Sequence, residues 1–142
     1  MENQELNLIK VDIKRTYPET PYFQSSEAQS ALLRLLGSLS KHSSSAGYTQ
    51  GMNNIMASLL FHSDEVIAFE LAIRLLNDYH LKEVHMSRLP GLYYHCDIVG
   101  QLIQDMLPSL SSHFARYDIK PILFCQNWIL CLFTQVIPLS RI

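Results

Sequence analysis

Apolar residues recur every three or four positions through most of the chain, which is the spacing of α-helices that bury one face. The clearest run follows Ser26-Glu27-Ala28-Gln29, whose serine and glutamine have the form of a capping box, and it predicts a helix from Ser26 to about Ser40. A polar, serine-rich loop occupies Lys41 to Gly47. The same spacing resumes at Met52 and predicts a second helix of about three turns.

Three further helices follow from the pattern in the second half of the chain. Ser63-Asp64-Glu65 supplies a cap and early acidic residues for a helix to about Tyr79. The apolar positions on which its buried face is predicted are Ile67, Leu71 and Leu75, widened by Phe69, Ala72 and Leu76. After the break at Leu89-Pro90-Gly91, helices are expected from Leu92 to about Met106 and from Pro108 to Phe114.

The stretch from Pro121 to Ser140 contains no charged residue, and its length alone would permit a membrane span. Polar side chains interrupt it at Gln126, Asn127, Thr134 and Gln135, which fall near one face of a helix. We therefore expect a buried core helix with a polar stripe rather than a transmembrane helix. No run of alternating β-branched residues bounded by hairpin turns is found, so the predicted fold class is all-α with about six helices.

Composition narrows the functional classes. The 142 residues are 48% hydrophobic, which indicates one globular unit. The net charge is −2 and no basic cluster is present, so nucleic acid is not an expected partner. The charged fraction of 17% is below the roughly one-quarter that is usual for globular domains. We therefore expect an exposed apolar surface that another polypeptide, or a longer form of the chain, would cover.

Cysteine, histidine and glycine patterns exclude several kinds of site. The three cysteines fit neither a disulfide ladder nor a zinc knuckle, and the N-terminus is not a signal sequence, so a reducing, cytoplasmic location is predicted. Six scattered histidines, of which the closest pair is five apart, predict no metal site, and we expect them on the surface or at caps. Neither a Walker-type loop nor a G-x-G-x-x-G motif occurs. His95-Cys96-Asp97 predicts no nucleophile because adjacent helical residues diverge.

Two segments contain candidate residues for a functional site. Asp12 precedes Arg15 by three positions at the threshold of a segment in which Pro18 and Pro21 prevent helix continuation. The arginine is therefore predicted at a helix end, where the carboxylate can hold its guanidinium group. On spacing alone, an ordinary surface salt bridge is the favoured alternative.

The second segment runs from Ala46 to Asn54. Two glycines, Gly47 and Gly51, bracket a tyrosine and Gln50 directly before a predicted helix. Glycines permit close backbone approach, and a helix N-terminus favours a phosphate group. A plain helix start with a buried tyrosine explains the segment equally well.

Together these segments resemble a known family, the TBC-domain GTPase-activating proteins that act on Rab GTPases. The resemblance rests on I-x-x-D-x-x-R-T at Ile9 to Thr16 and on G-Y-x-Q-G-M-N at Gly47 to Asn53. Weaker likenesses lie at Glu65 to Phe69 and at Trp128 to Arg141. Tyr17 and Thr49 replace the phenylalanine and valine that the family often carries.

The resemblance implies a mechanism with two catalytic side chains supplied in trans. Arg15 would be an arginine finger that neutralises phosphoryl charge, and Gln50 a glutamine finger that orients the attacking water. The residues that the motif match makes supporting or orienting are Asp12, Thr16, Tyr48, Gly51 and Asn53. GTP and magnesium would belong to the partner GTPase, and the chain would have no cofactor of its own. The alternative is a catalytically silent helical scaffold or binding module with the same fold.

The family pattern is longer than this sequence at both ends. No R-x-x-x-W motif precedes Ile9, and a tryptophan-aspartate and further helices would follow Ile142. Residues 1–142 are therefore expected to form a partial TBC domain of about two-thirds the family length, with weak activity when isolated. The family also implies vesicle trafficking and an endomembrane location reached through partners.

Overall fold

Residues 2–42 and 47–142 are described by a computed structural model of the chain, so residues 43–46 of the predicted loop lie outside the described part. All regular secondary structure in that part is helical, which confirms the all-α prediction. In chain order the elements are α1 (Glu2–Lys14), α2 (Pro21–Gln24), α3 (Ser26–His42), α4 (Met52–His62), α5 (Glu65–Asp78), α6 (Leu81–His85), α7 (Pro90–Met106), α8 (Pro108–Arg116), α9 (Ile122–Leu130) and the 3-10 turn η1 (Leu139–Arg141).

The described helices exceed the predicted six by α1, which the sequence indicated only as a helix end before Arg15, and by the short α2 and α6, which carry little periodicity. α2 and α6 span 4 and 5 residues, fewer than two helical turns. The longer predicted helices are found near their expected positions, as α3, α4, α5, α7 and α8. Pro108 begins α8 as expected, and the Asp64 carboxylate caps α5 by accepting from the Ile67 amide at 2.9 Å.

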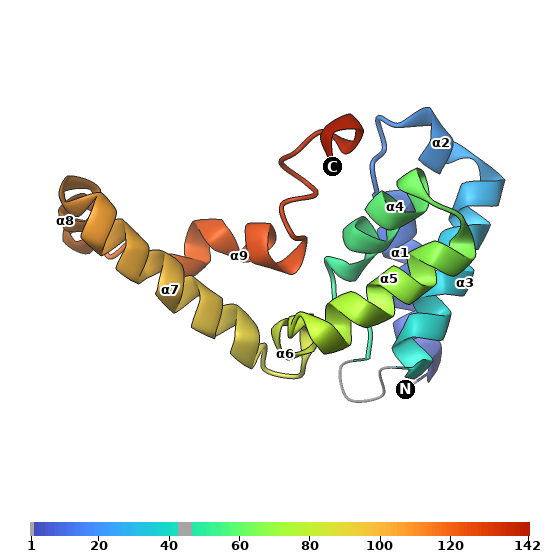
Figure 1. The fold of residues 1–142 in the computed structure, drawn as a ribbon, viewed down its shortest axis with the longest axis horizontal. Coiled ribbons are helices and arrows are strands. Elements are labelled where there is room, and N and C mark those ends of the chain that lie inside the picture. Colours follow the sequence, from blue (N-terminus) through green and yellow to red (C-terminus); the bar gives the residue numbers. More distant parts are fainter. Residues whose placement is uncertain (1, 43–46) are drawn as a thin grey trace.

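The helices form two arms joined at an elbow (Figure 1). Helices α1 to α5 make a bundle, α6 lies at the elbow, and α7 leads away from it into an arm completed by α8 and α9. The segment after α9 then returns to the bundle and ends near α2 and α4 (Figure 1). Two long-range hydrogen bonds fix that return, from the Tyr17 hydroxyl to the Thr134 carbonyl at 2.8 Å and between His62 Nε2 and the Leu139 carbonyl at 2.8 Å.

Helix α4 lies at the centre of the bundle. Every residue from 52 to 58 is buried, including the polar Asn53, Asn54 and Ser58. Around it pack α1, α3 and α5, whose fully buried side chains include Ile9, Leu32 and Ala68. Polar groups on such a helix need partners inside the protein. This requirement explains why two α4 asparagines reach side chains of other segments.

Two local predictions at helix starts and faces were wrong in detail. The residue that caps α3 is Ser25, not Ser26, and its hydroxyl accepts from the Ala28 amide at 3.2 Å. In α5 the buried residues are Ala68, Ala72 and Leu76, whereas Ile67 and Leu71 are exposed. Small alanines let α5 approach its neighbours closely, and this packing outweighs the larger transfer energy of the isoleucine and leucine.

The predicted core helix from Pro121 to Ser140 was also wrong. Helix α9 ends at Leu130, and left-handed backbone at Leu132 (φ 47°) and Phe133 (φ 61°) turns the chain back toward the bundle. The expected polar stripe is divided, since Gln126 and Asn127 are exposed on α9. The buried residues of this stretch are Cys125, Cys131, Thr134 and Leu139.

The described helices include none that is long and apolar enough to cross a membrane. The three cysteines are free and buried, and the Cys125 thiol donates to the Cys96 sulfur at 3.3 Å, joining α9 to α7. Burial raises the pKa of the Cys96 thiol to about 12. This thiol is therefore part of the packing between the two helices of the arm.

Candidate functional site

Arg15 stands directly after α1, as the sequence predicted. The backbone tightens there, with the Arg15 amide bonded to the Asp12 carbonyl at 3.1 Å, and Tyr17 adopts a left-handed conformation (φ 43°) before Pro18. Proline fixes its own backbone and disfavours helix at the preceding residue, so the helix stops. The Arg15 side chain is 55% exposed, which leaves it accessible to a partner.

One carboxylate joins the two candidate segments. Asp12 is buried, and its Oδ1 accepts from Arg15 Nε at 2.9 Å and lies 2.7 Å from Arg15 Nη2. The other oxygen, Oδ2, accepts from the Tyr48 hydroxyl at 2.7 Å. The Asp12–Arg15 pair is therefore not an isolated surface salt bridge, because a half-buried tyrosine from the second segment completes it.

The Tyr48 phenol is fixed in its neutral, donating form. Burial raises its pKa above the usual range, and the hydrogen bond to the Asp12 carboxylate raises it further. A neutral phenol donates a hydrogen bond to the Asp12 carboxylate and carries no negative charge that would repel it. Asp12 consequently stays available to hold the guanidinium group of Arg15.

A second chain of hydrogen bonds runs through the supporting residues of the motifs. The Thr16 hydroxyl donates to the Asp12 carbonyl at 2.7 Å and accepts from Asn53 Nδ2 at 2.8 Å. The Asn53 carbonyl oxygen then accepts from the Gly51 amide at 3.1 Å. The start of α4 is thereby tied to the end of α1, with the buried polar groups of both threonine and asparagine satisfied.

Gln50 lies exposed in the turn directly before α4. The turn depends on glycine, since Gly51 has φ 107° and a Cβ there would meet the Leu130 carbonyl oxygen at 2.7 Å. Gly47 opens the segment with φ 61°. The structure thus brings Asp12, Arg15, Thr16, Tyr48, Gly51 and Asn53 into one network and places Gln50 at its edge.

Sequence reasoning missed the groups that support this network from the elbow and the second arm. The Thr49 hydroxyl donates to the His85 carbonyl of α6 at 2.9 Å, and the Tyr17 hydroxyl reaches Thr134. Both side chains carry a hydroxyl, but their partners lie 36 and 117 positions away, so no local spacing in the sequence pointed to them.

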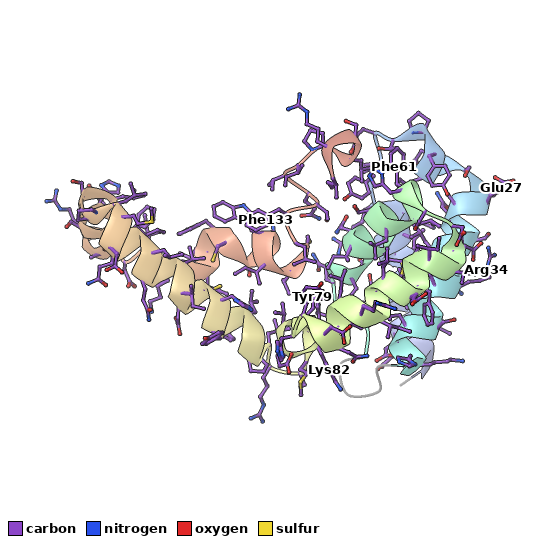
Figure 2. All side chains as sticks on the ribbon, viewed as in Figure 1. Glu27, Arg34, Phe61, Tyr79, Lys82 and Phe133 are labelled. Carbon is purple, nitrogen blue, oxygen red and sulfur yellow. The ribbon has the colours of Figure 1, made fainter. Side chains whose placement is uncertain are left out.

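A cavity of about 260 Å³ opens beside Arg15. Its lining consists of Arg15, Tyr17, Pro18, Glu19, Asn54 and Gln135. A larger cavity, of about 780 Å³, is lined by residues of α2 to α5, among them Glu27 and Arg34, which Figure 2 labels. There Arg34 is engaged by Glu65, with Nη2–Oε1 at 2.6 Å and Nε–Oε2 at 3.2 Å. The smaller cavity is therefore the one associated with the network.

The histidines were predicted at the surface or at caps, and His85 contradicts this. Its imidazole is fully buried, and neither ring nitrogen has a hydrogen-bond partner. Burial lowers the pKa of His85 to about 4, because the charged form would lose its hydration. The part of the chain that the structure describes contains no group of three His, Cys, Asp or Glu side chains able to hold a metal ion.

Known proteins are similar to this chain in sequence and in fold. A family model described as the Rab-GTPase-TBC domain matches residues 1–142. The Rab GTPase-activating protein eat-17 of Caenorhabditis elegans is 33% identical over 134 residues, covering 94% of this chain and 15% of that protein. The GTPase activating protein Gyp51 of Schizosaccharomyces pombe is 38% identical over 114 residues, covering 80% and 11% respectively. The chain therefore spans a small part of the length of these relatives.

Two solved structures have the same fold. The crystal structure of the Ypt/Rab-GAP domain of Gyp1p matches with a TM-score of 0.86 at 21% identity, over 98% of this chain and 52% of that one. The Chlamydomonas flagellar RabGAP TBC domain matches with a TM-score of 0.80 at 30% identity, over 96% and 46%. The match of the family model over residues 1–142 shows that the chain belongs to the Rab-GTPase-TBC domain family.

Proposed function

We propose that this chain stimulates GTP hydrolysis by a Rab-type GTPase, with Arg15 and Gln50 as the side chains that complete the GTPase site. The observation that carries the proposal is the Asp12 carboxylate, which bonds Arg15 of one segment and Tyr48 of the other. One buried group thereby holds an exposed arginine and, through Tyr48, contacts the segment that carries the exposed Gln50 two residues later. The names of the relatives, which describe GTPase-activating proteins, support the same reaction.

Arg15 would act on charge. Phosphoryl transfer spreads negative charge over the transferring oxygens, and an arginine supplied to a Ras-type site is worth about 10³ to 10⁵ in rate. Asp12 contacts Nε and Nη2, so the Nη1 amino group is not needed for the ion pair and can donate to a phosphate oxygen. Holding the guanidinium group in advance removes part of the ordering cost of the reaction.

Gln50 would act on the attacking water. An amide has both a donor and an acceptor, so it can fix the orientation of a water molecule toward phosphorus. The Gly51 turn presents this amide ahead of α4, at the edge of the network that holds Arg15. GTP and magnesium would be carried by the GTPase, at a cytoplasmic location consistent with three free thiols.

Single-turnover hydrolysis of GTP on a panel of purified Rab GTPases tests this proposal. The chain should accelerate hydrolysis by at least one of them. Arg15→Lys should lower the stimulated rate by about 100-fold or more, because an ammonium group lacks the planar fork of the guanidinium group. Gln50→Ala should also lower the rate. The double variant should lose less than the product of the single losses, since both groups serve one transition state.

Matched controls are available within the chain. Arg34→Lys changes an exposed arginine that is paired with Glu65 outside the network, and Gln104→Ala changes an exposed glutamine of α7. Both should leave the rate close to that of the unaltered chain. Equal rates for Arg15→Lys and Arg34→Lys would contradict the arginine assignment, and a chain that binds Rab GTPases without accelerating hydrolysis would instead be a scaffold.

A further inference from the structure

The segment that carries Gln50 is held between two elements. Residues 47–49 have no regular secondary structure. The Tyr48 hydroxyl bonds Asp12 of α1, and the Thr49 hydroxyl bonds the His85 carbonyl of α6. Gln50 follows directly after these two contacts.

The acceptor of the Thr49 bond is a carbonyl at the end of a helix. His85 is the last residue of α6, and carbonyl groups in the last turn of a helix have no partner within the helix. Thr49 supplies a partner at 2.9 Å, in a half-buried position. The hydrogen bond therefore satisfies a helix end while it fixes the main chain next to Gln50.

The other end of this contact belongs to a packed element. The His85 side chain is fully buried, and α6 packs against α5, α7 and α9. Thr49 is consequently attached to the elbow between the two arms.

We propose that Thr49 is a positioning residue for Gln50, which it holds in register with the GTPase site through its hydrogen bond to the His85 carbonyl. This inference rests on the proposed function, because it assigns how one of the two catalytic side chains is aimed. Misplacing a catalytic group by about 1 Å can cost about 100-fold in rate. Thr49 acts through Gln50, so its effect should disappear when the glutamine is absent.

Thr49→Val is the informative variant because it removes the hydroxyl and keeps the branched shape. In single-turnover hydrolysis on a responsive Rab GTPase, it should lower the maximal rate by about tenfold and change the half-saturating concentration by less than about twofold. Thr49→Ser, which keeps the hydroxyl, should restore the rate to within about twofold of the unaltered chain. In a Gln50→Ala background, Thr49→Val should change the rate by less than about twofold.

Ser63→Ala is the matched control, since the Ser63 hydroxyl donates to the Leu59 carbonyl at 2.7 Å at the far end of α4. It removes one hydroxyl–carbonyl bond without touching the Gln50 segment, and its rate should stay within about twofold of the unaltered chain. Circular dichroism establishes that each variant is folded. Should Thr49→Val fail to fold, Thr49→Ala takes its place with the same expectations.

The outcomes separate this inference from the proposed function. If Gln50→Ala loses activity and folded Thr49→Val does not, the positioning role of Thr49 is overturned and the proposed function stands. The same conclusion follows if Thr49→Val is equally damaging in the Gln50→Ala background, which would indicate a general structural role. If the unaltered chain accelerates no GTPase, or Gln50→Ala has no effect, both proposals are overturned.

Discussion

At the scale of single residues, Asp12 is the group on which the candidate site depends. It is a buried carboxylate that accepts hydrogen bonds from Arg15 Nε and the Tyr48 hydroxyl and forms an ion pair with Arg15 Nη2. A buried charge is tolerated only when its partners compensate the lost hydration. The same requirement that stabilises Asp12 therefore orients Arg15, so stability and proposed activity share one set of contacts.

Removing the Tyr48 hydroxyl tests this dependence. Tyr48→Phe deletes one hydrogen bond to a buried charge, which should lower the free energy of unfolding by about 1.5 to 3 kcal/mol. It should also lower the rate of stimulated GTP hydrolysis, because the Asp12 carboxylate that holds Arg15 then lacks one of its hydrogen-bond donors. Chemical denaturation and single-turnover hydrolysis measure the two effects.

Tyr17→Phe is the control for that variant. It removes a buried phenol bond of similar length, 2.8 Å to the Thr134 carbonyl, while leaving every partner of Asp12 in place. It should cost stability and lower hydrolysis less than Tyr48→Phe does. A larger effect on hydrolysis from Tyr17→Phe would show that Asp12 is not the group that couples Tyr48 to activity.

At the scale of elements, the close approach of α9 to the start of α4 shapes the Gln50 turn. Gly51→Ala would place a Cβ 2.7 Å from the Leu130 carbonyl oxygen and force a non-glycine residue to φ 107°. Strained backbone of this kind costs about 1 to 3 kcal/mol before the clash is counted. Thermal and denaturant unfolding should show a loss at least this large.

Gly37 provides the comparison, because it lies within α3 and a Cβ there would meet Leu6 Cδ2 at an ordinary 3.7 Å. Gly37→Ala should raise the free energy of unfolding by about 0.5 to 1 kcal/mol, since alanine is the better helix former. Equal effects of the two substitutions would mean that the turn does not require glycine.

Helix α6 gives the molecule a pH dependence through His85. Its pKa in the folded state, about 4, lies below the ordinary value of 6.5, so the unfolded state binds the proton more readily. The stability that His85 contributes is complete above pH 6.5 and is lost as the pH falls toward 4. The expected loss is about 3 kcal/mol over this window, and denaturant unfolding at a series of pH values checks it.

His85→Leu isolates this effect from the titration of carboxylates. It places an apolar, non-titrating side chain in the buried site and should flatten the decline in stability between pH 6.5 and 4 relative to the unaltered chain. Parallel curves for the two proteins would contradict the assignment to His85.

At the scale of the whole molecule, the second arm and the segment that follows α9 expose much apolar surface. The exposed large hydrophobic residues from α7 onward are Tyr93, Tyr94, Leu102, Met106, Leu107, Leu110, Tyr117, Leu123, Leu132, Phe133, Val136, Ile137 and Ile142. Helix α8 buries no residue completely, and Phe133 is labelled beside α9 in Figure 2. The low charged fraction of the sequence has its structural counterpart in this arm.

The isolated chain should therefore bind a hydrophobic dye and self-associate with increasing concentration. Dye fluorescence and size-exclusion chromatography with light scattering measure these properties. Leu123→Glu together with Val136→Glu should reduce both and leave the free energy of unfolding within about 0.5 kcal/mol, because the two side chains are 67% and 58% exposed. A compact monomer that does not bind the dye would contradict this expectation.

The sequence by itself determined the features whose causes lie within a few residues. Helical periodicity, the Asp64 cap and the proline at the start of α8 were readable because they depend on neighbours one to four positions apart. Arg15 after a helix end was readable for the same reason, since Pro18 and the spacing from Asp12 act locally.

Only the tertiary structure decided the features that depend on distant segments. The buried face of α5, the end of α9 at Leu130 and the bond from Thr49 to His85 all follow from how helices pack, and no local spacing encodes them. The motifs contain the residues that form the network around Asp12. The contacts of the turn that carries Gln50 are decided by packing, because the free energy of a buried hydrogen bond or a close contact depends on which surfaces meet.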